Sequence, residues 1–115
     1  MKDLSGNSKK EDINETLSNE FKDNVSKGDV DIVRSALLDD LIIYRHDYKK
    51  FDIELNYAKS KLPNIIEDFD EKEGSIENNP DKWDKQYLNL QKVHLMVNFS
   101  DKRIQHLKNV INKVL

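Results

Sequence analysis

The sequence contains no cysteine, three glycines, two prolines and no long apolar run. The absence of cysteine excludes disulfides, thiol catalysis and cysteine-ligated zinc sites. Scarce glycine and proline, together with many leucine, lysine, glutamate and aspartate residues, favour helix over sheet. The densest apolar stretch is LLDDLIIY at 37–44, and because two aspartates interrupt it we expect no membrane partner.

The charge balance is slightly acidic, with a net charge of −3 and a pI near 5.6. Proteins that bind duplex nucleic acid usually present a basic surface, so we expect no nucleic-acid partner for the whole domain. The N-terminal residues MKDLSGNSKKEDINE lack the apolar stretch of a signal peptide, so we expect a cytoplasmic protein. A length of 115 residues fits one domain with a modest core.

Apolar residues recur at steps of three and four along most of the chain, which is the spacing of amphipathic helices. We therefore predict an all-α fold, a single small helical bundle of about five helices over residues 12–115, after a flexible N-terminus over residues 1–11. The last two helices should form an antiparallel hairpin, with Ser100 as the cap between them. The helices are expected near 12–27, 29–45, 47–61, 81–98 and 101–115.

The expected helix at 81–98 carries apolar residues around most of its circumference. A helix of this kind touches several neighbours, so we predict that it lies at the centre of the bundle. Its predicted main stripe consists of Trp83, Tyr87, Leu90, His94 and Val97, with Leu88, Leu95 and Met96 beside it.

The sequence shows no motif of a catalytic or metal centre. The stretch DFDEKEG resembles a calcium-binding loop, but counted from Asp68 its sixth position is Glu73 rather than glycine, and its twelfth is Asn79 rather than glutamate. Neither HExxH nor GxSxG occurs, and there is no glycine-rich phosphate loop. We therefore expect no enzyme activity, no catalytic residue, no metal and no cofactor.

Residues 67–84, EDFDEKEGSIENNPDKWD, form an acidic segment that is also rich in helix breakers. It carries eight carboxylates against Lys72 and Lys82, a net charge of −6, and we find no structural role for this charge. Plain solubility is one explanation, and attraction and selection of a basic partner is the other. We predict partner binding by Asp68, Asp70, Glu71, Glu73, Glu77, Asp81 and Asp84, with neighbouring charge from Asp39, Asp40 and Asp47.

The chain after the acidic segment has the opposite charge, because residues 85–115 hold six lysine or arginine residues and only one acid, Asp101. On the last helix, a basic rim at the surface is expected from Lys102, Arg103, Lys108 and Lys113. Nucleic-acid binding through this rim is the weaker interpretation, since the segment lacks the short glycine turn of a helix-turn-helix. A solvated face that complements the acidic segment is favoured.

Three stretches resemble small all-helical bacterial immunity proteins of polymorphic and contact-dependent toxin systems, namely VRSALLDDLI (33–42), FDIELNYAKSKLP (51–63) and WDKQYLNLQKVHLMVNFSDKRIQHLKNVI (83–111). The resemblance covers most of residues 29–115, and its most distinctive part is NFSxxRxxHL, from Asn98 to Leu107. It implies an immunity protein that binds and neutralises a cognate toxin domain, for example a basic nuclease domain. It assigns no functional residues.

The alternative interpretation is a non-enzymatic regulatory or structural protein–protein interaction module. Such a module would use an apolar or basic helix face instead of the acidic segment. The sequence leaves the identity of the protein partner and the oligomeric state open.

Overall fold

The computed structural model describes residues 17–115, which contain five α-helices, two short 3₁₀ helices and no strand. The α-helices are α2 (Asn19–Ser26), α3 (Val30–Ile43), α4 (Lys49–Lys61), α5 (Lys85–Val97) and α6 (Asp101–Val114); the 3₁₀ helices are η1 (Glu71–Glu73) and η2 (Pro80–Lys82). The prediction of an all-α bundle is confirmed. The predicted flexible N-terminus, residues 1–11, and the predicted start of the first helix lie outside the described residues.

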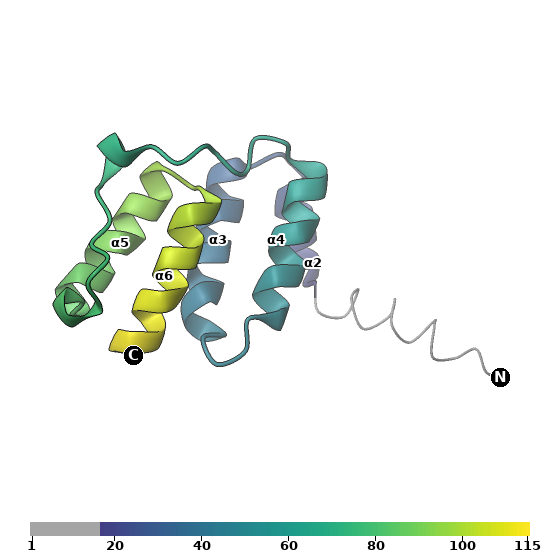
Figure 1. Cartoon of the computed structure of the whole chain (residues 1–115). Helices are drawn as coiled ribbons and strands as arrows, with labels where there is room; N and C mark the ends of the chain where they lie inside the picture. Colours follow the sequence, from purple (N-terminus) through teal and green to yellow (C-terminus); the bar gives the residue numbers. More distant parts are fainter. Residues whose placement is uncertain (1–16) are drawn as a thin grey trace.

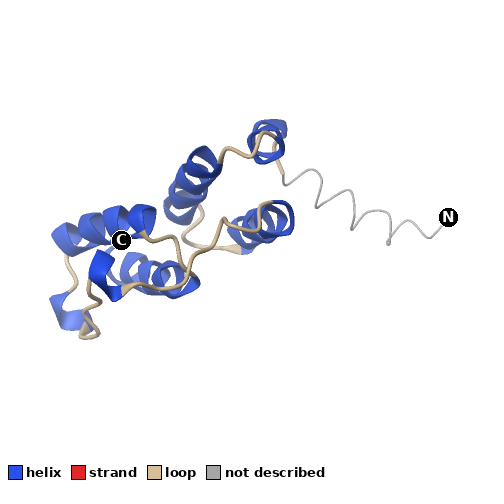
Figure 2. Cartoon of the chain, turned by 90° about the horizontal axis from the view of Figure 1, so that it is seen from above, coloured by secondary structure: helices blue, strands red, loops and turns tan. Residues whose placement is uncertain are grey.

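The helices form two groups that share one core. α2, α3 and α4 contact one another, while α5 and α6 form the predicted hairpin, which packs against α3 (Figure 1). The view in Figure 2 shows α2 at the end of the molecule away from the hairpin. The Lys59 ammonium pairs with the Asp101 carboxylate at 3.1 Å, which joins α4 to the start of α6. None of the helices in residues 17–115 combines the length and the apolar character that a membrane crossing requires.

Short polar side chains set where several helices begin. Ser18 accepts a hydrogen bond from the Phe21 amide at 3.0 Å, and α2 begins at Asn19. Ser100 caps α6 as predicted, accepting from the Arg103 amide at 3.4 Å. Asp84 accepts from the Tyr87 amide at 2.8 Å, and α5 therefore begins at Lys85 rather than at residue 81. In each case a side-chain acceptor satisfies an amide of the first helical turn.

Helix ends follow backbone chemistry that is visible in the sequence. Gly28 has φ +71° and separates α2 from α3. Leu62 is extended, as the residue before Pro63 is expected to be. The predicted helix over 29–45 ends earlier, at Ile43, and Arg45 lies in the following turn, where its Nη1 donates to the Ile42 carbonyl at 3.0 Å.

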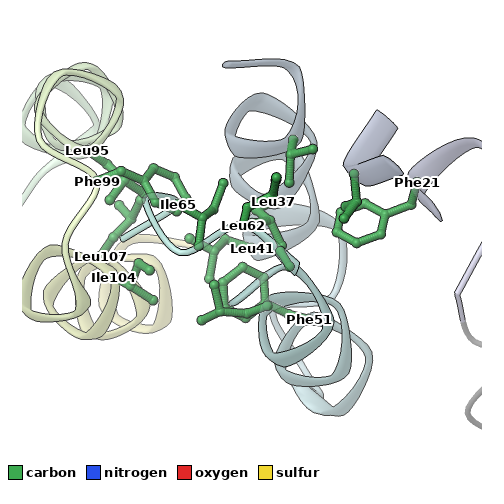
Figure 3. Close-up of a cluster of buried hydrophobic side chains, with 14 of the residues drawn as sticks. Phe21, Leu37, Leu41, Phe51, Leu62, Ile65, Leu95, Phe99, Ile104 and Leu107 are labelled. Atoms are coloured by element: carbon green, nitrogen blue, oxygen red, sulfur yellow. The ribbon is translucent and has the colours of Figure 1, made fainter. Parts of the chain in front are cut away.

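The core is continuous from α2 to the hairpin. Figure 3 shows the Phe21 side chain directed at Leu37 and Leu41 of α3, with Phe51 of α4 beneath them. On the other side, Phe99 is fully buried between α5 and α6 and joins the hairpin to this cluster. The remaining labelled side chains fill the space between the two groups: Leu62, Ile65, Leu95, Ile104 and Leu107.

The prediction that α5 is the central helix is wrong. α5 lies at the edge of the bundle (Figure 1), and its buried residues are Leu88, Gln91 and Leu95. The predicted stripe residues Leu90 and Val97 are 48% and 51% exposed, and Val93 between them is 59% exposed. Apolar residues surround this helix, so contact with α6 and α3 decides which of them are buried. An apolar stripe consequently remains on the outer face of α5.

Candidate partner-binding site

The acidic segment is held against the α5–α6 hairpin along its length. It leaves the end of α4, crosses one end of the hairpin, and then runs beside α5 to the start of that helix (Figure 1). Three side chains of the hairpin hold it: the buried Arg103, the buried Asn98 and the aromatic Tyr87. The segment is therefore a fixed surface feature built on a helical scaffold.

Arg103 makes the central contacts to the acidic segment. Only 3% of this residue is exposed, although it stands on the first turn of α6. Its Nε donates to Asn98 Oδ1 at 2.9 Å, and its Nη2 donates to the carbonyls of both Asp70 and Gly74 at 2.7 Å. The Phe69 ring covers the guanidinium, with its centroid 4.7 Å away. One buried cation thus ties two separate points of the segment to the hairpin.

Asn98 completes these contacts from the end of α5. Its Oδ1 also accepts from the Asp70 amide at 2.9 Å, and its Nδ2 donates to the Asp68 carbonyl at 2.9 Å. Next to it, the Glu67 amide donates to the Phe99 carbonyl at 2.8 Å, and Glu67 Oε1 accepts from the Phe99 amide at 3.0 Å. The backbone at the start of the segment is therefore paired with the turn between α5 and α6.

Aromatic residues hold the second half of the segment. Trp83 Nε1 donates to the Glu77 carbonyl at 2.8 Å, and the Tyr87 hydroxyl accepts from the Glu77 amide at 2.9 Å. The same hydroxyl lies 2.7 Å from His106 Nε2 on α6. Burial, with the nearby Arg103 charge, lowers the pKa of His106, which favours a neutral ring whose Nε2 can accept a hydrogen bond from the Tyr87 hydroxyl. Burial raises the pKa of Tyr87, which keeps that proton in place.

Gly74 fits a position that other residues cannot occupy without strain. Its φ is +147°, and a Cβ at this position would overlap the His94 ring. Its carbonyl is one of the Arg103 acceptors. Glycine is therefore required both for the backbone conformation and for the close approach to α5.

The structure corrects the expectation that the acidic charge has no structural role. Asp70 accepts from the Lys72 amide at 3.0 Å and begins η1, while Asp84 caps α5. Glu77 accepts from the Asn79 amide at 3.0 Å. The remaining predicted partner-binding residues are exposed, and their carboxylates make no hydrogen bond or ion pair within residues 17–115: Asp68, Glu71, Glu73 and Asp81.

The three additional acids do not join the acidic segment. Asp47 accepts from the Lys49 amide at 3.0 Å, at the start of α4. Asp39 and Asp40 line a different hollow between α2, α3 and α4, to which no residue of the acidic segment contributes. The predicted addition of their charge to the acidic surface is therefore wrong.

The residues of the predicted basic rim make contacts with other parts of the same chain. Arg103 is buried, and the Lys102 ammonium lies 4.4 Å from the Phe69 ring centroid. Lys108 pairs with Asp52 of α4 at 3.1 Å, and Lys113 donates to the Pro80 carbonyl at 3.2 Å. The sequence did contain a signal for Arg103: it lies one turn before the core residue Leu107, on the buried face of α6.

An apolar hollow adjoins the end of the acidic segment. Its volume is about 640 Å³, and it extends along the outer face of α5, lined by Lys82, Asp84, Gln86, Tyr87, Asn89, Leu90 and Val93. Exposed Val97 continues the same face one turn further. Carboxylates and an exposed apolar stripe are thus neighbours on one side of the hairpin, which is a composition that suits protein binding.

Within residues 17–115, no group of three or more His, Asp or Glu side chains is placed to hold a metal ion. No protein-family model matches the chain, and comparison with curated proteins and with solved structures gave no match. The function must therefore be argued from the site itself.

Replacing Arg103 should destabilise the fold strongly. We expect Arg103→Ala to lower the free energy of unfolding by about 2–4 kcal/mol, because the buried acceptors on Asn98, Asp70 and Gly74 lose their donor. Arg103→Lys should restore little, since an ammonium cannot reproduce the separated donors of a guanidinium. Urea denaturation measures both values. Exposed Gln105 on α6 is the control, and a loss in Arg103→Ala no larger than in Gln105→Ala would contradict the assignment.

Gly74→Ala should also destabilise the protein, by about 1–3 kcal/mol, because the added methyl group both overlaps His94 and disfavours the positive φ. The matched control is Gly28→Ala, which has a positive φ but open space around its Cβ position. Thermal melts of both variants separate the two effects. An equal loss of stability in the two variants would mean that the close approach of Gly74 to His94 contributes nothing.

Proposed function

We propose that this chain is an immunity protein: a non-enzymatic bacterial inhibitor that binds a cognate toxin domain and neutralises it. The observation that supports this proposal best is the acidic segment, whose backbone is fixed by Arg103 and Asn98 while its carboxylates face solvent. Binding to a basic protein surface requires no catalytic group on this chain. A cytoplasmic location, where an intracellular toxin would act, belongs to the same proposal.

Fixed charge favours binding to a basic partner in two ways. Exposed Asp68, Glu71, Glu73 and Asp81 give the surface a negative potential, which accelerates encounter with a positive surface. Because the backbone is already held by the hairpin, little conformational entropy is lost when the partner binds. A nuclease domain is the partner class that fits best, since its substrate cleft is built to receive a row of phosphate charges.

The outer face of α5 adds the apolar contact that a tight complex needs. Leu90 and Val93 border the hollow beside the acidic segment, and both are about half exposed. Burial of apolar side chains at the centre of an interface determines dissociation more than encounter. We therefore expect a two-part interface, in which the carboxylates speed association and the α5 stripe slows dissociation.

A second candidate function rests on that stripe alone. Leu90, Val93 and Val97 lie on one face of α5 at the spacing of a helix that packs against another helix. A regulatory or structural interaction module would bind a partner helix here and leave the acidic segment unoccupied. The two functions therefore differ in whether the carboxylates contribute to binding.

The immunity function is tested by expressing the neighbouring gene with and without this chain. We expect the neighbour to arrest growth when expressed alone, relief of the arrest on co-expression, and copurification of the two proteins. A harmless neighbour, or a toxic one that neither binds nor is neutralised, would contradict the proposal.

Reversal of two exposed carboxylates tests the acidic surface. In the complex with the copurified partner, we expect Glu71→Lys combined with Glu73→Lys to slow association by about tenfold or more, with an effect that shrinks as salt is added. Stopped-flow or surface-plasmon measurements give the rates. Glu77 is left unchanged because it accepts a backbone hydrogen bond.

The control for net charge is Asp23→Lys combined with Asp31→Lys, which changes the charge equally on exposed sites of α2 and α3. An equal slowing by both pairs would show that overall charge, and not the acidic segment, controls association.

Replacement of Val93 tests the apolar stripe. Val93→Ser should leave stability within about 0.5 kcal/mol, because the side chain is mostly exposed, but should increase the dissociation rate several-fold. Ile32→Ser, at a 48% exposed site on α3, is the matched control. Loss of binding in Val93→Ser with no effect of the carboxylate reversals favours the interaction module over the immunity protein.

A further inference from the structure

A second hollow lies between α2, α3 and α4, the helix group that does not include the hairpin. Its volume is about 240 Å³. The lining combines one aromatic wall, Phe21, with carboxylates and one lysine, and the charged members are Glu20, Asp39, Asp40, Lys50 and Glu54. Four carboxylates thus face one ammonium in a cleft that the proposed immunity function does not use.

Glu54 is the unusual member of this group. It is 3% exposed, and its Oε1 is buried without a hydrogen-bond partner in residues 17–115. Its carboxyl group lies within hydrogen-bonding reach of the Asp40 carboxyl group across the α3–α4 contact. Burial, and then the hydrogen bond and charge of Asp40, raise the pKa of Glu54 to about 8. At neutral pH Glu54 therefore holds a proton, and its buried Oε1 stays without a hydrogen-bond partner within residues 17–115.

Lys50, which also lines the cleft, does not donate a hydrogen bond to Glu54 Oε1. Lys50 Nζ donates to the Tyr44 hydroxyl at 3.0 Å and lies 4.8 Å from the Tyr44 ring centroid. The hydrogen bond to Tyr44 is also the main reason why the pKa of Lys50 is raised. The cation already present is thus held at Tyr44, and an acceptor in the cleft remains available.

The chemistry of the cleft favours an organic cation over a metal ion. Within residues 17–115, the cleft included, no three potential metal ligands lie close enough together to hold one metal ion. A guanidinium group is planar, carries several donors, pairs with carboxylates and stacks on aromatic rings. We propose that the cleft between α2, α3 and α4 binds a guanidinium group, with Asp40 and Glu54 as its acceptors and Phe21 as one wall.

Binding of the cation displaces the proton of Glu54. The proton leaves Glu54 for solvent, and both carboxylates then accept from the guanidinium, so charge and protons balance. Affinity should rise with pH up to about 8, where Glu54 is ionised before binding, and then level off. The other titratable groups that line the cleft with Glu54 are Glu20 on α2, Asp39 and Asp40 on α3, and Lys50 on α4. Tyr44, which follows α3, accepts from Lys50.

Isothermal titration calorimetry of the full chain tests this site with propylguanidinium, its neutral analogue propylurea, and the blocked tripeptide acetyl-Gly-Arg-Gly-amide. We expect binding of one or both guanidinium probes but not of propylurea, with proton release at pH 7 that is seen as a dependence of the heat on the buffer. Binding of the tripeptide alone identifies the occupant as an arginine side chain of a partner. Comparable binding of propylguanidinium identifies a small molecule.

The variants are chosen to separate the cleft from general electrostatics. Glu54→Gln should weaken propylguanidinium or tripeptide binding at least tenfold and abolish the proton release, whereas Asp31→Asn, with the same loss of charge at an exposed site, should change neither. The site is refuted by equal binding in Glu54→Gln and the wild type, by equal binding of propylurea, or by binding of Mg²⁺ or Ca²⁺ in place of the guanidinium probes.

A pH series of thermal melts tests whether Glu54→Gln is folded and whether it removes the titration of Glu54. The folded wild type holds the Glu54 proton more tightly than the unfolded chain, so its stability should fall as pH rises from about 5 to 8. Glu54→Gln should fold and lack this fall. If Glu54→Gln fails to fold, Asp40→Asn replaces it in the titration with the same expected loss of affinity.

Discussion

The buried guanidinium of Arg103 is the interaction on which the arrangement of the hairpin side of this protein depends. It binds the Asn98 side chain and the carbonyls of Asp70 and Gly74, so it joins the end of α5, the start of α6 and the acidic segment. Burying a cation is costly unless its donors are satisfied, and these three hydrogen bonds offset part of that cost, while the buried Nη1 has no partner within residues 17–115. The segment is consequently part of the fold and not an appendage to it.

This arrangement explains how opposite charges are distributed. The basic residues of α6 are paired within the chain: Arg103 with the backbone of the acidic segment, Lys108 with Asp52 and Lys113 with the Pro80 carbonyl. Exposed carboxylates of the acidic segment are left facing solvent beside the apolar face of α5. A small negative net charge thus becomes a strongly acidic surface on one side of the hairpin, which is the property that the proposed immunity function uses.

Local features were predictable from the sequence, and long-range ones were not. The Ser100 cap, the turn at Gly28 and the end of α4 before Pro63 depend on residues next to them in the chain, so the all-α fold and the hairpin could be predicted. The buried face of α5 could not, because apolar residues surround that helix and its neighbours decide which are covered. The spacing to Leu107 places Arg103 on the buried face of α6, but its acceptors lie 33 and 29 residues away, so the sequence pattern did not show what it binds. Glu54 is buried by tertiary packing, which the sequence pattern did not show either.

Native-state hydrogen exchange of the full-length protein tests most directly whether the acidic segment is a fixed surface. The amides of Asp70 and Glu77 donate to Asn98 Oδ1 and to the Tyr87 hydroxyl, and both acceptors belong to the hairpin. They should therefore be protected from exchange and should open together with core amides of α6 such as that of Leu107. Exchange of Asp70 and Glu77 at the rate of an unfolded chain, while Leu107 stays protected, would contradict the account.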